Sequence, residues 1–128
     1  MLVALTLLAC VPASGPSVDN FTGTAGSATL KRDITATVMQ SDQTRAIECE
    51  QRSIREIRPI DLNTQPDEKV TSIGVRGVEH WVLDRCGTTA SYIILFVPDP
   101  GGGTVFSVVL DTADTRSKLG LQIDLPAP

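Results

Sequence analysis

The chain has 128 residues, which is enough for one domain and too few for two. Hydrophobic residues make up 41% of it, so it can bury a core, and its formal net charge is -4 at neutral pH. This acidic balance excludes the basic surface with which nucleic-acid-binding proteins contact phosphates, and it gives no attraction to an anionic membrane surface.

The chain begins with an uncharged apolar run over residues 1–9 (MLVALTLLA), which ends directly before Cys10. The run is shorter than the roughly 20 residues that a membrane-spanning helix requires, but it has the length of the apolar region of a signal peptide. It lacks the Lys or Arg that usually precedes such a region. We therefore expect residues 1–9 to be a signal peptide that is removed on export.

The end of this run carries a family resemblance. Leu7, Leu8, Ala9 and Cys10 resemble the lipobox of bacterial lipoproteins. The resemblance implies cleavage between Ala9 and Cys10 and lipidation of Cys10, for example with palmitate, and two or more acyl chains give a stable membrane anchor. The next residue is Val11 rather than Asp, which resembles the enterobacterial lipoproteins that are sorted to the outer membrane. We therefore expect a lipoprotein of the bacterial cell envelope.

Residues 10–27 are rich in small and polar side chains, Pro and Gly, so they are predicted to form a flexible tether before a globular domain over 28–128. The chain has three cysteines, and lipidation of Cys10 would leave the pair Cys49 and Cys86. In an oxidising compartment this pair is predicted to form a disulfide, which would stabilise the domain by about 4 kcal/mol. A metal site on the two cysteines is the weaker alternative, because no CxxC is present, and we expect no metal and no cofactor.

Residues 28–40 fit two kinds of secondary structure. Leu30, Ile34 and Val38 recur at every fourth position, as on one face of a helix. The same residues also lie on one face of a strand together with Ala36, and we favour the helix slightly.

Residues 44–60 are predicted to form a short turn near Cys49 and then a strand over 54–60. Pro59 would end any helix here by Arg58, because the residue before a proline disfavours helical backbone angles.

The rest of the chain carries the stronger strand signals. After a polar loop over 61–69, apolar alternation and β-branched residues predict strands over 78–86, 91–97, 104–110 and 119–125. The second of these is apolar on both faces, so we expect it at the centre of the sheet. The Gly-rich segment 99–103 leads into a strand and not into a helix, so it is predicted to be a hairpin loop and not a phosphate-binding loop.

These elements predict one small α+β domain, dominated by an antiparallel β-sheet meander of about four to six strands with at most one or two short helices. Residues 79–108 resemble a stretch of small bacterial envelope proteins that share a Trp-bearing strand, a Cys-Gly turn, a Tyr-bearing strand and a Gly-rich hairpin. The resemblance covers about a quarter of the chain, and it implies a fold and not an activity.

His80, the only histidine, is the first candidate for catalysis. Ser91 and Asp84 are near it in sequence, but no G-x-S-x-G turn is present and strand alternation does not force His80 to meet Ser91. We therefore expect a partly exposed strand histidine and a protein that is not an enzyme. The acidic residues of two segments are expected to be solvated loop residues and not a glycosidase or calcium site: Asp61, Asp67 and Glu68, and Asp111 and Asp114.

Trp81 and Tyr92 are the large amphipathic aromatic residues of the chain. They are possible partner contacts, because such side chains often anchor interfaces, although packing in the core beside the disulfide is the favoured alternative.

Taken together, the sequence predicts a non-enzymatic structural or accessory subunit of the cell envelope. It would be held at the membrane by its lipid and would dock on a larger envelope assembly through a protein partner. The segments 54–60 and 119–125 are candidate sheet edges to which a partner could add a strand. The alternative is a periplasmic or surface module that binds a small ligand or glycan in a concave apolar pocket.

Overall fold

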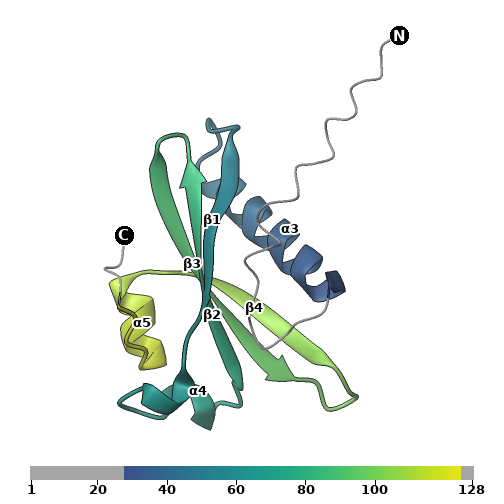
Figure 1. Ribbon diagram of the computed structural model, residues 1–128, viewed down its shortest axis with the longest axis vertical. Helices are drawn as coiled ribbons and strands as arrows, with labels where there is room; N and C mark the ends of the chain where they lie inside the picture. Colours follow the sequence, from purple (N-terminus) through teal and green to yellow (C-terminus); the bar gives the residue numbers. More distant parts are fainter. Residues whose placement is uncertain (1–27, 125–128) are drawn as a thin grey trace.

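The computed structural model describes residues 28–124 and shows one antiparallel sheet with the strand order β1-β2-β3-β4 (Figure 1). The elements in chain order are α3 (Ala28–Arg45), β1 (Arg52–Pro59), the 3-10 helix η2 (Leu62–Thr64), α4 (Lys69–Ser72), β2 (Gly77–Arg85), β3 (Thr88–Pro98), β4 (Thr104–Leu110) and α5 (Ala113–Leu119). The predicted α+β domain with an antiparallel meander is confirmed, but the described residues form three α-helices and a 3-10 helix instead of one or two short helices. The predicted signal peptide, the tether and Cys10 lie outside the described residues.

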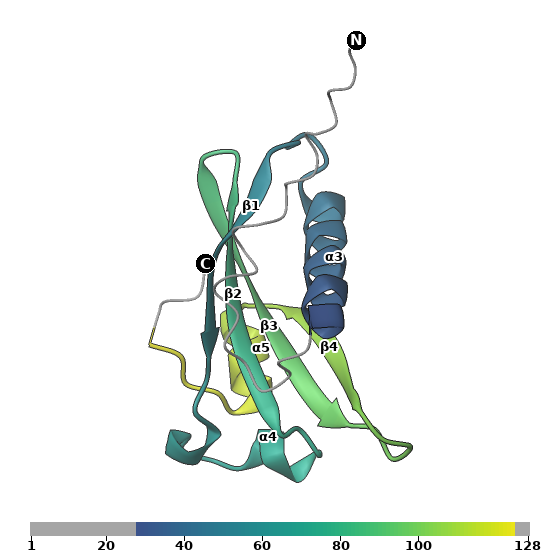
Figure 2. The same ribbon diagram turned by 45° about the vertical axis from the view of Figure 1, so that its right-hand side comes forward.

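Helices cover both faces of the sheet, with α3 on one face and α4 and α5 on the other (Figures 1 and 2). The core under α3 is formed by Ile34, Val38, Ile54, Ile57, Trp81, Leu83, Ala90, Tyr92, Ile94 and Phe96. The core on the other face is formed by Val70, Val75, Val78, Ile93, Leu95 and Leu121. Strand β3 contributes to both cores, which explains why its sequence is apolar on both faces and confirms its central position.

Helix α3 confirms the helical interpretation of residues 28–40 and extends it to Arg45. Its buried side chains are Ile34, Val38 and Asp42, which follow one another at every fourth position and so form one stripe toward the sheet. Asp42 occupies a stripe position at which packing alone would favour an apolar residue. This position marks Asp42 as a residue with a polar partner in the core.

Strand β1 confirms the strand that was predicted over 54–60, with its start two residues earlier and its end at Pro59, and it is an outer strand of the sheet. Its pairing with β2 shifts between Ile54 and Glu56, so Arg55 is an extra residue on this strand. Because of this bulge, Ile54 and Ile57 both face α3 although they are three positions apart.

The prediction of a strand over 119–125 is wrong for the residues that the structure describes. Leu119 is the last residue of α5, and residues 121–124 belong to no strand of the sheet. The helix begins after Thr112, whose hydroxyl oxygen accepts a hydrogen bond from a first-turn N–H. It ends at Gly120, whose φ of 66° is the left-handed conformation that commonly terminates helices.

The two hairpins of the meander are those that the sequence predicted. Cys86 and Gly87 join β2 to β3, and both have positive φ angles, 47° and 88°. The Gly-rich segment 99–103 joins β3 to β4, and the N–H of Asp99 closes it with a hydrogen bond of 3.0 Å to the carbonyl oxygen of Gly103. The polar segment 61–69 contains η2 and leads into α4.

Candidate functional site

Buried polar side chains form two networks, one on each face of the sheet. The α3-side network consists of Asp42, Arg52, Arg85 and Tyr92. The α5-side network consists of His80, Asp111 and Arg116, and Arg58 lies opposite His80 in the neighbouring strand β1. Both networks combine an aspartate with arginine, so the comparison of their hydrogen bonds decides what each of them can do.

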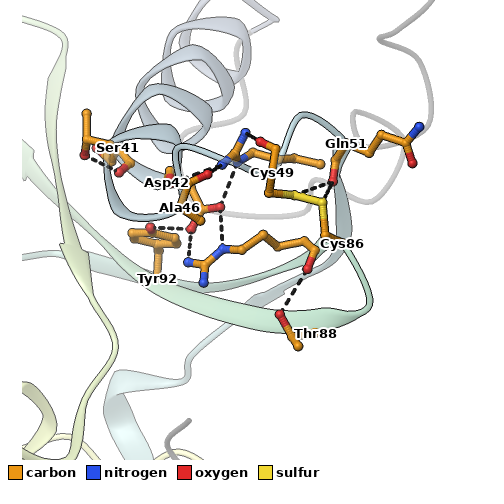
Figure 3. Close-up of polar contacts among 11 residues, drawn as sticks. Ser41, Asp42, Ala46, Cys49, Gln51, Cys86, Thr88 and Tyr92 are labelled. Carbon is orange, nitrogen blue, oxygen red and sulfur yellow. Dashed lines mark hydrogen bonds and ion pairs between the residues drawn. A yellow bond between two sulfur atoms is a disulfide. The ribbon is translucent and has the colours of Figure 1, made fainter.

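Asp42 is the centre of the α3-side network and accepts hydrogen bonds from three side chains (Figure 3). Its carboxylate lies 2.8 Å from Nε of Arg52 and 2.8 Å from the hydroxyl of Tyr92, and it also accepts from Nε and Nη2 of Arg85. Burial alone would raise the pKa of Asp42, but these hydrogen bonds outweigh burial and hold the pKa well below its usual range. Asp42 is therefore ionised at neutral pH.

Arg52 ties the end of α3 to the disulfide loop. Its guanidinium group donates hydrogen bonds to the carbonyl oxygens of Ala46 and Cys49, both at 2.6 Å, and these oxygens follow the last turn of the helix. Cys49 is joined to Cys86, so the predicted disulfide is present beside the network (Figure 3). The helix end, the start of β1 and the end of β2 are thus held together by hydrogen bonds and by one covalent bond.

The α3-side network presents no reactive group to a substrate. Burial and the bond to Asp42 raise the pKa of Tyr92 to about 12, so its hydroxyl stays protonated and donates. A surface hollow of about 580 Å³ lies beside the disulfide, but it is lined by residues 44–49 and Cys86 and by none of the four network side chains. The geometry is that of a structural clamp.

His80 is the centre of the α5-side network. It lies in β2, is 1% exposed, and its Nε2 is 2.8 Å from Oδ2 of Asp111. Asp111 also accepts two hydrogen bonds from Arg116 of α5, at 2.7 and 2.8 Å. Burial would raise the pKa of Asp111, but the bonds from Arg116 and His80 lower it. Because the ionised carboxylate can only accept, Nε2 of His80 carries a proton and donates it to this bond.

The structure corrects two predictions about these residues, the exposure of His80 and the place of Asp111. His80 is buried and not partly exposed. Its carboxylate partner is Asp111, which was predicted to lie in a solvated loop, whereas Asp84 is exposed. Ser91 is also buried, but it pairs with Val82 across the sheet, and no hydrogen bond joins it to His80 in the part of the chain that the structure describes. Ser91 and Asp84, which were considered as partners of His80 from their closeness in sequence, are thus not joined to it.

Four buried polar side-chain atoms of the described residues have no hydrogen-bond partner: Nε and Nη2 of Arg58, Nδ1 of His80 and Oε2 of Glu79. Three of these atoms belong to Arg58 and His80, which are directly opposite each other in β1 and β2. Opposite residues of an antiparallel pair lie on the same face, so Arg58 and His80 are neighbours on the α5 side of the sheet. The Arg58 side chain is 36% exposed and forms a long ion pair with Glu56, whose carboxylate is 4.0 Å from Nε of Arg58.

Glu79 is a separate buried acid on the α3 face of the sheet. Its Oε1 accepts a hydrogen bond of 3.0 Å from Nε1 of Trp81. Burial raises the pKa of Glu79, although the bond from Trp81 and the charge of Lys31 oppose the rise. Its charged form is therefore less favourable in the folded protein than in the unfolded chain.

The remaining candidate residues are placed as follows. Trp81 and Tyr92 are buried in the core under α3, so the role of partner contact is wrong for both and the core alternative is correct. Asp61, Asp67 and Glu68 are exposed residues outside the helices and strands, as predicted for a solvated loop. Asp114 is also exposed, but it lies in the first turn of α5 and not in a loop. Within residues 28–124, no three His, Cys, Asp or Glu side chains come together as a metal site.

The sequence analysis did not identify Asp42 or Arg58 as residues with buried polar atoms, although the spacing along the helix could have identified Asp42. It continues the series Leu30, Ile34 and Val38 at the next fourth position, and a charged residue in such a series requires a buried partner. Arg58 had no signal, because its importance comes from the register that places it opposite His80.

Comparison with known proteins adds no relative, because no family model, no curated protein and no solved structure matches the chain. Within the described part of the chain, no helix is long and apolar enough to cross a bilayer. The function must therefore be argued from the two networks and from the edges of the sheet.

Proposed function

We propose that this protein is a non-enzymatic accessory subunit of the bacterial cell envelope that docks on a larger assembly by strand pairing along β4. The observation that carries this proposal is the difference between the two outer strands of the sheet. Strand β1 carries Arg52, Arg55, Glu56 and Arg58, contains a bulge and ends at Pro59. Charges, bulges and proline on an outer strand all hinder pairing with another chain.

Strand β4 has none of these features. Its sequence TVFSVVL contains no charge and no proline, its pairing with β3 is regular, and Val105 is 50% exposed. An uncharged, regular outer strand is the kind of edge to which an extended segment of a partner protein adds as a further strand. Strand β4 thus takes the place of residues 119–125, which were predicted to be an edge and end a helix instead.

The backbone groups available on β4 can be assigned from its hydrogen bonds. The N–H of Asp111 donates to the carbonyl oxygen of Ser91, and the hairpin closes between Asp99 and Gly103, so the odd-numbered residues of β4 face β3. The outward N–H and C=O groups therefore belong to Thr104, Phe106, Val108 and Leu110. Among residues 28–124, no backbone hydrogen bond from another element reaches these four residues.

Two further observations support the proposal. The Cys49–Cys86 disulfide is typical of an exported protein in an oxidising compartment. The His80 imidazole is enclosed and bonded to Asp111, and Tyr92 is bonded to Asp42, which favours a non-enzymatic role for both side chains. The lipid anchor on Cys10 rests on the resemblance of residues 7–10 to a lipobox.

Site-specific photo-crosslinking in intact bacterial cells tests the docking surface. A photoreactive residue at Val105 is expected to give a discrete adduct with a partner protein, whereas the same residue at Arg55 on β1 is expected to give none. Val105→Lys should remove an adduct captured from a neighbouring reactive position such as Ser107, and Val105→Thr should preserve it. Equal adducts from both edges, or none from β4, would contradict the proposal.

The anchor is tested separately by the intact mass of the protein purified from membranes. The expected mass is that of residues 10–128 with a diacylglyceryl or triacyl group, and it should increase by two hydrogens on reduction of the disulfide. An unmodified mass would remove the lipid anchor from the proposal and would leave the β4 surface to the crosslinking result.

A further inference from the structure

We infer that the strand which pairs with β4 is β4 of a second copy of this chain, so that two copies form one continuous sheet about a two-fold axis. This inference rests on the docking along β4 that is proposed above, and it names the partner. Strand β4 is an outer strand of the sheet, and four strands from each copy would join there (Figure 1). The symmetric pair would then be the smallest unit of the larger assembly.

The first argument is the charge on the two edges of the sheet. Two copies of a charged strand would bring like charges close together across the interface, which is unfavourable. The edge at β1 is of this kind, because Arg52, Arg55 and Arg58 lie on it. Strand β4 carries no charged side chain, so it offers no complementary charge to a charged partner and no repulsion to a second copy of itself.

The second argument is the register that two-fold pairing allows. The outward N–H and C=O groups of β4 belong to even-numbered residues, so hydrogen-bonded pairing must place even-numbered residues opposite each other. With Ser107 on the axis, Phe106 lies opposite Val108 of the second copy. Thr104 likewise lies opposite Leu110. All four outward residues of each copy then have a hydrogen-bonding partner, and the strand is paired over its whole length.

The third argument is the fit of the side chains in this register. Val105 is 50% exposed, and it lies opposite Val109 of the second copy, which covers it. Phe106 and Val108 are partly buried on the α3 face, where they form a pair of an aromatic and a β-branched side chain across the interface. The two Ser107 hydroxyls meet at the axis, where they can form a hydrogen bond. The central polar residue of the strand thus obtains a polar partner.

The neighbouring two-fold registers fit less well. A shift of two residues in one direction places Leu110 opposite the hairpin loop 99–103 of the second copy, so its outward groups lose a strand partner. A shift of two residues in the other direction places the apolar Val105 opposite Asp111, whose carboxylate is already bonded to other side chains. The register centred on Ser107 is therefore the one that the sequence of β4 favours.

Disulfide crosslinking of the full chain in intact bacterial cells tests the partner. Ser107→Cys places two thiols opposite each other at the axis, in a non-hydrogen-bonded pair whose Cα atoms lie about 4.5 Å apart, which a disulfide can bridge. Mild oxidation is expected to give a covalent dimer with twice the mass of the chain, and a reductant should reverse it. The unchanged chain should give no such dimer, which controls for its own cysteines.

Two further cysteine variants test the register. In Val105→Cys alone, or in Val109→Cys alone, the thiols of two copies are four residues apart along the strands, about 14 Å, which is too far for a disulfide. Neither variant should give a dimer by itself, whereas cells that produce both variants should give one. A dimer from Val105→Cys alone that equals that from Ser107→Cys would overturn the two-fold register.

Two lysine variants, each combined with Ser107→Cys, test the apolar contact. Val105→Lys should lower the yield of dimer at least about tenfold, because a symmetric interface receives the added charge twice. Ile73→Lys makes the same change at another exposed apolar residue, at the end of α4, and should leave the yield unchanged. Equal yields from the two lysine variants would overturn the inference.

The crosslinking result also separates this inference from the docking proposal. A Ser107→Cys adduct with a different protein would overturn the second copy as partner and would leave docking along β4 in place. The absence of any adduct from Ser107→Cys, together with none from the photoreactive residue at Val105, would overturn both.

Discussion

The two buried networks of this protein use the same residue types and differ in how completely they are paired. On the α3 side, Asp42 accepts hydrogen bonds from two arginines and a tyrosine, and the other nitrogens of Arg52 donate to backbone carbonyl oxygens. On the α5 side, Asp111 accepts hydrogen bonds from Arg116 and His80. Nδ1 of His80 and two nitrogens of the neighbouring Arg58, however, have no hydrogen-bond partner among the described residues. A completely paired network stabilises the fold, whereas an incompletely paired one leaves buried polar atoms without hydrogen bonds among the described residues.

Asp42→Ala is expected to have the largest effect on stability. It removes the acceptor of two arginines and of Tyr92 in a buried site, so the free energy of unfolding should fall by about 3–5 kcal/mol. Urea unfolding with the disulfide intact measures this loss. Asp33→Ala is the control, because Asp33 is an exposed residue of the same helix and its replacement should change stability by less than about 0.5 kcal/mol. A loss below about 1 kcal/mol at Asp42 would show that the network is not a clamp.

The disulfide beside this network is expected to contribute a similar amount. Replacement of Cys49 and Cys86 by Ser should lower the free energy of unfolding by about 4 kcal/mol, because the unfolded chain loses the constraint of a long closed loop. Urea unfolding of the unchanged protein with and without a reductant should show the same loss, and the double variant should not respond to the reductant. A reductant effect that persists in the double variant would contradict the assignment.

Asp111→Asn should destabilise the protein less than Asp42→Ala, by about 2 kcal/mol. It leaves one guanidinium group without its carboxylate instead of two, and His80 can remain neutral. Urea unfolding measures this loss. A loss as large as that of Asp42→Ala would contradict the smaller effect expected for Asp111.

The dependence of stability on pH should distinguish the two kinds of buried acid. The pKa values of Asp42 and Asp111 are lower in the folded protein than in the unfolded chain. Their stabilisation is therefore fully present above the unfolded value, about 4, and is lost as the pH falls toward their folded values. The pKa of Glu79 is raised, so its charged form lowers stability at neutral pH.

Glu79→Gln is accordingly expected to increase the free energy of unfolding at pH 7, and this smallest effect should disappear at acid pH, where Glu79 itself is protonated. Glu56→Gln, at an exposed position on β1, should show no such change. Urea unfolding of both variants across the acid range measures the difference. A gain for Glu79→Gln that is equally large at acid pH would contradict the raised pKa.

The sequence predicted the meander because alternation and turn signals agree from β2 to β4. Residues such as Ile93 and Leu95 on one face and Tyr92 and Ile94 on the other identify a central strand without knowledge of its neighbours. Helix α3 was predicted from its stripe, although the same residues also fitted a strand. The Cys49–Cys86 disulfide followed from the count of cysteines that lipidation of Cys10 leaves.

The failures have identifiable causes. Residues 119–125 alternate like a strand, but Thr112 and Gly120 are strong signals for the start and the end of a helix, and these cap residues outweighed the alternation. The Asp111–His80 contact depends on the order of three strands, and the pairing of Arg58 with His80 depends on the bulge in β1 that sets their register. Contacts of this kind belong to the assembled sheet and to no local pattern in the sequence.

One experiment compares the two faces directly, namely the exchange with solvent of the arginine side-chain Nε–H protons in the folded domain. We expect the Nε–H protons of Arg52 and Arg85 to exchange slowly, because Asp42 accepts their hydrogen bonds, and the Nε–H proton of Arg58 to exchange faster, because it has no acceptor among the described residues. Equally slow exchange at all three arginines would contradict the distinction between a completely paired network and an incompletely paired one.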